Sequence, residues 1–345
     1  MMDKDLVQIA IIGCGAVTER GHLPATTKIS NCRVTLLVDN NLEHAKKLSN
    51  IYNISTISDD YHAAVDHANA AIVALPHHLH APVSCELLEA GLHVLVEKPM
   101  ALSSSECNTM LAAAKKGRAV LAVGLMRRFL NSIQFTHWLL NEGILGQIKE
   151  FDVQEGNVYN WPVTSDFFFH RSTAGGGVLF DTGAHTLDLL LYLLGDVVDL
   201  EYYDDSYGGI EADCKLYLKM QSGAKGNIEL SRSRDLRNTA IIKGEHGILE
   251  VHLRKNWVLL NSCDKALGFE GYGIVSGSTG IKEQKFSDLF QPQLEDWIAS
   301  IQKKRVPTVP GEEAMRSIAL VEACYAHRKQ LELPWVQPER KILQK

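Results

Sequence analysis

The sequence predicts an α/β domain followed by an α+β domain. The first is a Rossmann fold with a doubly wound parallel sheet, and the second has an open, mostly antiparallel sheet flanked by helices. Short apolar runs alternate with helical stretches over residues 1–125, and a glycine-rich turn follows the first run. From residue 126 onward, to residue 345, the pattern changes to strands and turns. The length of 345 residues also exceeds what one hydrophobic core normally serves.

The N-terminal part contains apolar runs of strand length at residues 7–12, 34–38, 70–75, 94–96 and 119–123. Most are apolar on both faces, which is typical of parallel strands covered by helices on both sides. Helical stretches separate them at residues 42–52, 82–89 and 104–116. This alternation predicts a parallel, doubly wound sheet.

The C-terminal part resembles an antiparallel sheet from about residue 148 to 260, with hairpin turns at residues 222–223 and 246–247. The other expected elements are a helix over residues 177–194, a long loop over residues 264–284, and amphipathic helices over residues 293–303 and 312–331.

The composition excludes several classes of partner. A formal net charge of −6 argues against nucleic acid or an anionic membrane. The longest apolar stretch, residues 187–194, is far shorter than a membrane-spanning helix, and no segment resembles a signal peptide. The 7 cysteines are scattered and form no C-x-x-C, as is typical of a reducing compartment. A cytoplasmic protein is therefore expected.

The stretch "IAIIGCGAVTERGH" places two glycines at the end of the first strand. Gly13 permits a tight turn, and Gly15 lets a pyrophosphate approach the backbone at the start of the next helix, where Ala16 and Val17 follow. Thr18 replaces the third glycine of the G-x-G-x-x-G pattern. These residues predict a dinucleotide site, although glycines also end strands for other reasons.

An acid ends the second strand. Asp39 is positioned to accept hydrogen bonds from the adenine ribose hydroxyls and to repel a 2′-phosphate. No arginine follows it immediately, so NAD is favoured over NADP. The alternative is a solvated acid that opens a turn with Asn40 and Asn41.

The stretch "ALPHHLH" carries three histidines after the strand at residues 70–75. A metal site is one interpretation, but no acid or cysteine is suitably spaced nearby, so no metal is predicted. Contacts of Leu75, Pro76 and His80 with a cofactor are the expectation. Simple loop and helix-cap roles are the alternative.

The motif "EKP" follows the next strand, so its loop opens at the same edge of the sheet as the glycine turn. Pro99 restricts the backbone at Lys98. A positive charge there could bind a substrate oxygen and stabilise a developing alkoxide beside a nicotinamide, with Glu97 also at the cofactor. The alternative is a lysine that merely ends a strand.

The helix in "GGGVLFDTGAHTLDLLLYLLG" carries Asp181, His185 and Asp188 on one face. A histidine is the natural general base near neutral pH, and a carboxylate one turn away could orient it or raise its basicity. A structural polar network is the alternative. Zinc would find a poor tetrahedral set here.

An aromatic segment, residues 157–171, precedes this helix. Tyr159, Trp161 and Phe168 could stack on a sugar, with Arg171 nearby for a charged substituent. Aromatic packing beneath a loop explains the segment equally well.

In combination, these motifs resemble the Gfo/Idh/MocA family over nearly the whole chain. The resemblance rests on Gly13, Gly15 and His22, on "EKP" at residues 97–99, on "GGG…D-x-G-x-H-x-x-D" at residues 175–188, and on "VGLMRRF" and "QLEDWIASI". Members are nicotinamide-dependent oxidoreductases that act mostly on sugars, cyclitols and their derivatives.

The resemblance implies that Lys98 contacts both substrate and nicotinamide, and that His185 exchanges the hydroxyl proton while Asp181 assists it. It also implies C-terminal helices that pack back on the first domain, and a homodimer or homotetramer formed through the second sheet. Relatives of two other kinds supply the alternatives. One kind uses bound NAD in glycoside cleavage or epimerisation without net redox change, and the other consists of ligand-sensing regulatory proteins.

Overall fold

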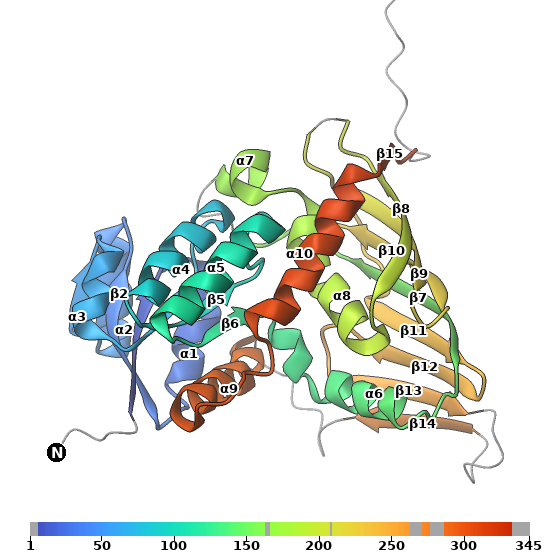
Figure 1. Cartoon of the computed structure of the whole chain (residues 1–345), viewed down its shortest axis with the longest axis horizontal. Coiled ribbons are helices and arrows are strands. Elements are labelled where there is room, and N and C mark those ends of the chain that lie inside the picture. Colours follow the sequence, from blue (N-terminus) through green and yellow to red (C-terminus); the bar gives the residue numbers. More distant parts are fainter. Residues whose placement is uncertain (1–5, 163–165, 208, 263–270, 277–285, 333–345) are drawn as a thin grey trace, which may run out of the picture.

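A computed structural model of the chain describes residues 6–162, 166–207, 209–262, 271–276 and 286–332. Two sheets form the two halves of the molecule, and helix α10 (Gly311–Ala326) runs between them (Figure 1). It contacts both α5 (Ser104–Gly117) of the first half and α8 (Val178–Leu194) of the second.

The N-terminal sheet has the strand order β3-β2-β1-β4-β5-β6. The strands are β1 (Val7–Ile12), β2 (Cys32–Val38), β3 (Thr56–Ser58), β4 (Ala70–Val73), β5 (His93–Glu97) and β6 (Leu121–Gly124). All neighbouring pairs are parallel, which confirms the predicted sheet. Strand β3 was not predicted, because three residues are too few to form a recognisable apolar run.

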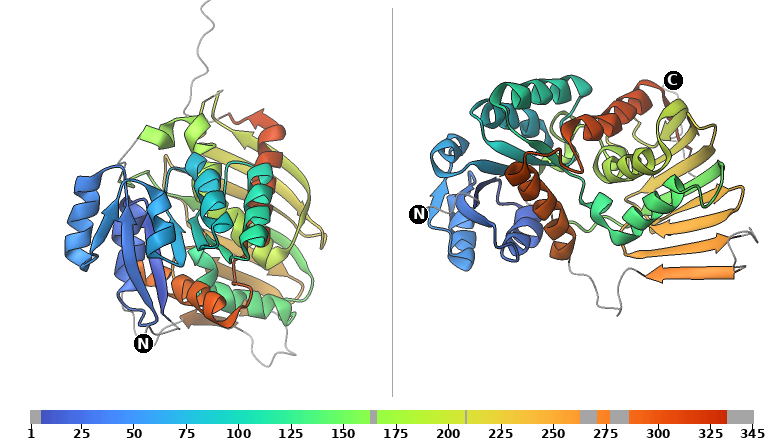
Figure 2. Two further views of the ribbon diagram at one scale, coloured as in Figure 1. Left: turned by 60° about the vertical axis from the view of Figure 1, so that its left-hand side comes forward. Right: turned by 60° about the horizontal axis from the view of Figure 1, so that its bottom comes forward.

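Helices cover both faces of this sheet, so alternate residues of β1 lie in different hydrophobic cores. Ile12 packs in the cluster that contains residues of α4 (His80–Glu89) and α5, whereas Ile11 packs with α1 (Leu23–Thr26), α2 (Leu42–Tyr52) and α9 (Phe290–Lys303). Trp297 of α9 is 1% exposed in this second cluster. A helix from near the C-terminus therefore completes the core beneath the first sheet (Figure 2).

The second sheet has the order β14-β13-β12-β11-β7-β10-β9-β8-β15 in the described part of the chain. Its strands are β7 (Ile148–Gly156), β8 (Val197–Asp204), β9 (Asp213–Met220), β10 (Lys225–Ser231), β11 (Thr239–Gly244), β12 (Gly247–His252), β13 (Trp257–Ser262), β14 (Gly271–Ser276) and β15 (Arg328–Gln330). Only β7–β10 and β8–β15 pair in parallel among these, so the sheet is mostly antiparallel, as predicted. The predicted hairpins join β9 to β10 and β11 to β12.

One face of this sheet packs against helices, and no described helix covers the other (Figures 1 and 2). In β9, Leu216 and Leu218 are buried while Tyr217 is exposed, which is the alternation of a half-buried strand. The buried side meets α8, which is confirmed at the predicted position, and α6 (Asn131–Asn141) packs near the β12–β13 end.

Two expectations about the secondary structure were wrong. The expected loop over residues 264–284 contains β14, which pairs with β13, because the short β-forming run Ile274-Val275 is masked by its Gly- and Ser-rich surroundings. The rest of that loop lies outside the described residues. The last helix ends at Ala326 instead of residue 331, because Arg328–Gln330 pair with β8 as strand β15.

The sequence predicted no apolar stretch long enough to span a membrane, but helix α8 and the residues before it reach that length. The stretch Arg171–Leu194 is long and apolar enough to cross a bilayer by composition, yet 72% of its most apolar window is buried inside the protein. This burial is typical of the core helix of a globular domain.

Candidate functional site

A cleft of about 1140 Å³ lies between the two halves. Except for Arg171, every residue predicted for cofactor, substrate or catalysis lines it. The residues that do so are Gly13, Gly15, Ala16, Val17, Asp39, Leu75, Pro76, His80, Glu97, Lys98, Tyr159, Trp161, Phe168, Asp181 and His185. The cleft therefore joins the carboxyl edge of the parallel sheet to the helix face and loops of the second domain.

The glycine turn after β1 leaves room for a ligand. Gly13 has φ +99°, and a Cβ there would come within 2.2 Å of the Ala74 carbonyl oxygen, so only glycine fits. A Cβ at Gly15 would meet nothing within 4 Å. The open space at Gly15 suits a bulky phosphate group beside the backbone.

Asp39 closes the same turn from the end of β2. Its Oδ2 accepts a hydrogen bond from the Cys14 backbone N–H at 2.7 Å, and its Oδ1 accepts one from Asn41 N–H at 2.8 Å. Both the predicted ribose role and the alternative turn with Asn41 involve this carboxylate. The turn contact is present in this structure.

Two of the three histidines after β4, His77 and His80, bind backbone groups. The Nδ1 of His77 donates to the Ala174 carbonyl at 2.8 Å, and burial lowers the pKa of His77 to about 3. The ring nitrogens of His80 lie 2.7 and 2.8 Å from the carbonyl oxygens of Pro99 and Leu75. His80 thus ties the loop after β4 to the loop after β5. No group of three or more possible metal ligands occurs among the described residues.

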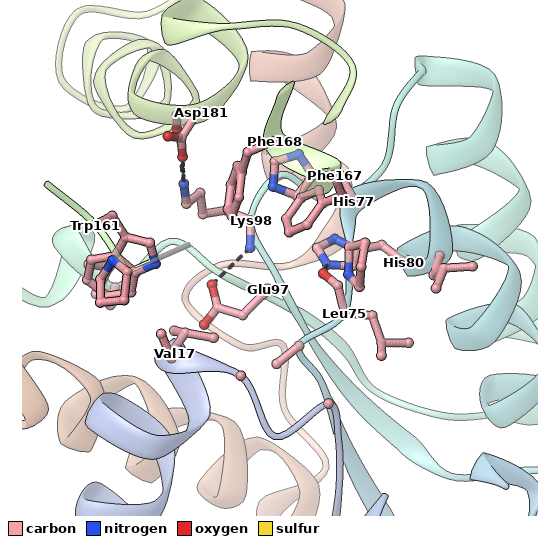
Figure 3. Close-up of a pocket in the computed structure, with 18 of the residues that line it drawn as sticks. Val17, Leu75, His77, His80, Glu97, Lys98, Trp161, Phe167, Phe168 and Asp181 are labelled. Atoms are coloured by element: carbon pink, nitrogen blue, oxygen red, sulfur yellow. Dashed lines mark hydrogen bonds and ion pairs between the residues drawn. The ribbon is translucent and has the colours of Figure 1, made fainter. Parts of the chain in front are cut away.

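Glu97 anchors the loop that presents Lys98. Its Oε1 accepts a hydrogen bond from Nε2 of the fully buried His22 at 2.8 Å, and its Oε2 accepts one from the Lys98 backbone N–H at 3.1 Å. The lysine is thereby fixed at its backbone, and its side chain points toward α8 (Figure 3).

Lys98 and Asp181 form an ion pair across the cleft (Figure 3). The Nζ of Lys98 donates to Asp181 Oδ1 at 2.6 Å and to the Asp181 carbonyl at 3.1 Å. Burial alone would raise the pKa of Asp181, but Lys98 and Arg232 lower it to about 2. Asp181 is therefore ionised at neutral pH and directs the lysine into the cleft.

His185 lies one turn further along α8 and is 5% exposed. Burial, and then the nearby cations Arg127, Lys98 and Arg254, hold its pKa well below the usual value of 6.5. The expectation that a carboxylate raises its basicity is wrong, because Asp181 bonds to Lys98 and the cations outweigh it. A neutral imidazole remains, with Nδ1 buried and unpartnered among the described residues.

Asp188, the third residue of the predicted face, has a structural partner. Its carboxylate accepts two hydrogen bonds from Nε and one from Nη2 of Arg128, and both side chains are 2% exposed. This part of the face is the polar network that the sequence left as an alternative.

A second buried network lies behind His185. Glu155, fully buried at the end of β7, binds Arg127 at 2.9 Å and Arg254 at 2.6 Å, and also accepts a hydrogen bond from Thr186. Burial opposes ionisation of Glu155, but the two arginines lower its pKa to about 2. The network keeps both arginines in place beside the cleft.

The aromatic segment divides between the cleft and its surroundings. Phe168 and Phe167 line the cleft and pack edge-on against His77, with Trp161 on the opposite side of Lys98 (Figure 3). Tyr159 lines the cleft beside Arg232. Arg171 instead stacks on Tyr325 and does not line the cleft, so its expected role at a charged substituent is not supported.

Sequence reasoning missed three arginines of the cleft: Arg127, Arg232 and Arg254. Strands β7, β10 and β12 all run in the same direction, as their pairings require, so their carboxyl ends reach the same edge. Arg232 directly follows β10, and Arg254 follows β12. The available signal was therefore "SRSR" and "HLRK" at strand ends, but only the strand order brings these together.

The cleft fits a nicotinamide dinucleotide. The open space at Gly15, the acid at the end of β2 and a lining that includes both Asp39 and His185 match the parts of such a cofactor. Gly13–Val17 would hold its pyrophosphate, and Pro76, His80 and Lys98 would border its nicotinamide half.

A Rossmann sheet whose carboxyl edge faces a second domain across such a cleft is typical of nicotinamide-dependent oxidoreductases. The model of an oxidoreductase family with an NAD-binding Rossmann fold matches residues 7–125, and that of the family's C-terminal alpha/beta domain matches residues 138–337. The chain belongs to the Gfo/Idh/MocA family, which confirms the resemblance read from its motifs.

Several curated relatives are named for sugars or cyclitols. A proposed oxidoreductase subunit of UDP-kanosamine synthase from Amycolatopsis mediterranei is 32% identical over 299 residues, with 84% of this chain and 78% of the relative covered. Inositol 2-dehydrogenase 2 of Saccharopolyspora erythraea is 24% identical over 331 residues, 92% of each chain.

Solved structures share the fold across both domains. Levoglucosan dehydrogenase in complex with NADH and L-sorbose gives a TM-score of 0.83 at 19% identity, covering 93% of this chain and 97% of the other. An aldose-aldose oxidoreductase from Caulobacter crescentus, complexed with glycerol, gives 0.81 at 24% identity, covering 93% and 97%.

Proposed function

We propose that this protein is an NAD-dependent dehydrogenase that oxidises a hydroxyl-bearing carbon of a sugar, cyclitol or sugar derivative, or reduces the corresponding carbonyl. The observation that carries the proposal is the ion pair of Lys98 and Asp181 at 2.6 Å beside the neutral His185, at the end of the cleft opposite Asp39. The sugar and polyol substrates named for the relatives support the substrate class.

Each polar group has a distinct role in this proposal. Bound nicotinamide would accept or supply the hydride. His185 takes the hydroxyl proton, because its neutral imidazole has a nitrogen free to accept it. Lys98 donates to the substrate oxygen and stabilises negative charge that develops there. Asp181 holds Lys98 in position, which replaces the earlier expectation that it orients His185.

We extend the proposal to NAD as the preferred cofactor over NADP. Among the residues that line the cleft near Asp39, the charged groups are Asp39 itself and Asp59, and none is a lysine or arginine. A 2′-phosphate at this end would meet like charges and no cationic partner.

The decisive assay is net formation of NADH with a panel of sugars and cyclitols, followed by absorbance at 340 nm. Accumulation of NADH in proportion to oxidised substrate supports the dehydrogenase. Conversion of a glycoside or epimer without accumulation would instead favour a redox-neutral enzyme. Ligand binding without any turnover would favour a regulatory relative.

A further inference from the structure

The end of the cleft that contains Lys98, Asp181 and His185, called the substrate end below, carries an excess of positive charge. Every lysine and arginine that lines the cleft lies there, namely Lys98, Arg127, Arg232 and Arg254. The acids that pair with these four are Asp181 and Glu155. With Glu97, which lines the cleft beside Lys98, four cations face three anions and leave an excess of one positive charge, while His185 is neutral. Glu97 is hydrogen-bonded to His22 on the cofactor side.

Three of the four cations have a protein partner within 3 Å. Arg127 and Arg254 share Glu155, and Arg254 also donates to Asn157. Lys98 shares Asp181 at 2.6 Å. These contacts hold their charged groups at the wall of the cleft.

Arg232 differs from the others. Among the described residues its guanidinium makes no side-chain hydrogen bond, and its one ion-pair partner is Asp181, at 3.6 Å from Nη2. Its Nε is buried without a partner. The group lies over the ring of Tyr159, with 5.3 Å from Cζ to the ring centroid, while no described side chain accepts a hydrogen bond from it.

A guanidinium held over an aromatic ring can still offer its N–H donors to a ligand. Two parallel N–H donors match the two oxygens of a carboxylate or phosphate, and such paired bonds between opposite charges are among the strongest in proteins. A neutral polyol would leave these donors with only hydroxyl acceptors and would leave the excess charge uncompensated.

From this arrangement we infer that the substrate carries an anionic group, a carboxylate or a phosphate, and that Arg232 binds it. The inference rests on the proposed dehydrogenase function and narrows its substrate class to sugar acids or sugar phosphates. Arg127 and Arg254 add to the field that attracts the anion, and Lys98 remains at the reacting oxygen.

Binding to the NADH-saturated protein tests the inference without requiring turnover. Matched sets of glucose, glucuronate and glucose 6-phosphate, and of myo-inositol and an inositol monophosphate, are titrated with NADH fluorescence or calorimetry as the readout. We expect at least one anionic member to bind about tenfold or more tightly than its neutral counterpart. The carboxylate and phosphate arms identify which anion is preferred.

Variants of Arg232 test whether this residue causes the preference for anionic ligands. Arg232→Gln removes the charge and should abolish the preference, and Arg232→Lys should retain part of it. Arg237→Gln is the matched control, because Arg237 pairs with Asp152 and does not line the cleft. Thermal unfolding of each variant checks that the fold is kept.

Equal affinity for neutral and anionic members of every set, including no measurable binding of either, would overturn the inference. A preference that survives in Arg232→Gln would also overturn it. An anionic preference without redox turnover in either direction would uphold the inference while the proposed dehydrogenase function fails. Efficient oxidation of neutral sugars without a preference for anionic ligands would overturn the inference while the proposed dehydrogenase function stands.

Discussion

The two ends of the cleft carry opposite charges although similar features build them. The end of the cleft near Asp39, where the proposed function places the adenosine of the cofactor, is called the adenosine end. It is formed where β2 and β3 finish, and its charged residues are Asp39 and Asp59. The substrate end is formed where β5 and β6 of one sheet and β10 and β12 of the other finish, and it holds all four cations of the cleft.

This difference indicates that the fold provides the location and the residues at the strand ends provide the selectivity. Carboxyl ends of parallel strands gather loops at one edge of a sheet whatever their sequence. In the proposed function, acids at one end disfavour an extra phosphate on the cofactor, whereas cations at the other favour an anion on the substrate. Each end can therefore be altered without the other.

The largest effect on turnover is expected from removal of the proposed proton acceptor, His185. His185→Ala should lower kcat by roughly 10²–10⁴-fold, because the proton of the hydroxyl loses its acceptor. Binding of NAD should stay nearly unchanged, which NADH fluorescence would measure. His137→Ala is a suitable control, since His137 stacks on Tyr192 away from the cleft. Near-normal turnover of the His185 variant would remove it from the mechanism.

Lys98→Met should lower kcat by roughly 10²–10³-fold, the usual loss when one donor to a developing oxyanion is removed. Steady-state assays in both directions would measure it. The variant also leaves Asp181 with Arg232 as its remaining cationic partner, so a loss confined to KM would indicate that Lys98 only binds substrate.

The adenosine end is tested by Asp39→Asn. Removal of the carboxylate charge should raise the affinity for NADPH relative to NADH by about 10- to 100-fold, because like-charge repulsion of the 2′-phosphate disappears. Asp66→Asn, outside the cleft on α3 (Ala64–His67), is the control. An unchanged ratio would favour the alternative in which Asp39 only supports the turn with Cys14 and Asn41.

The smallest effect is a displacement of the pH profile. His185 must be neutral to accept a proton, and burial together with Arg127, Lys98 and Arg254 holds its pKa well below 6.5. Oxidation should therefore keep its rate as the pH falls through 6.5 and decline only at lower pH. The pH dependence of kcat/KM measures this, and an acid limb centred at or above 6.5 would contradict the account.

The sequence allowed the parallel sheet, helix α8 and many of the residues of the cleft to be predicted, because these depend on local patterns. Asp181 and His185 are one turn apart, so helical spacing alone places them together. The partner of Asp181 could not be read in the same way, since Lys98 is 83 residues distant in the chain.

The arginines of the cleft could not be predicted from local sequence patterns. Arg232 and Arg254 converge through the strand order β12-β11-β7-β10, which depends on pairing between strands far apart in the sequence. Whether an arginine at a strand end faces a cleft or solvent depends on that order. Arg234 illustrates this, because two residues after Arg232 it pairs with Asp213 and Glu229 instead.

The most direct test of the central claim compares both ends in the same experiment. NADH and NADPH affinities, and neutral and anionic ligand affinities, are measured in the wild type, Asp39→Asn and Arg232→Gln. The account predicts that Asp39→Asn changes only the cofactor ratio and Arg232→Gln only the ligand ratio. A variant that changes both ratios equally, or neither, would contradict it.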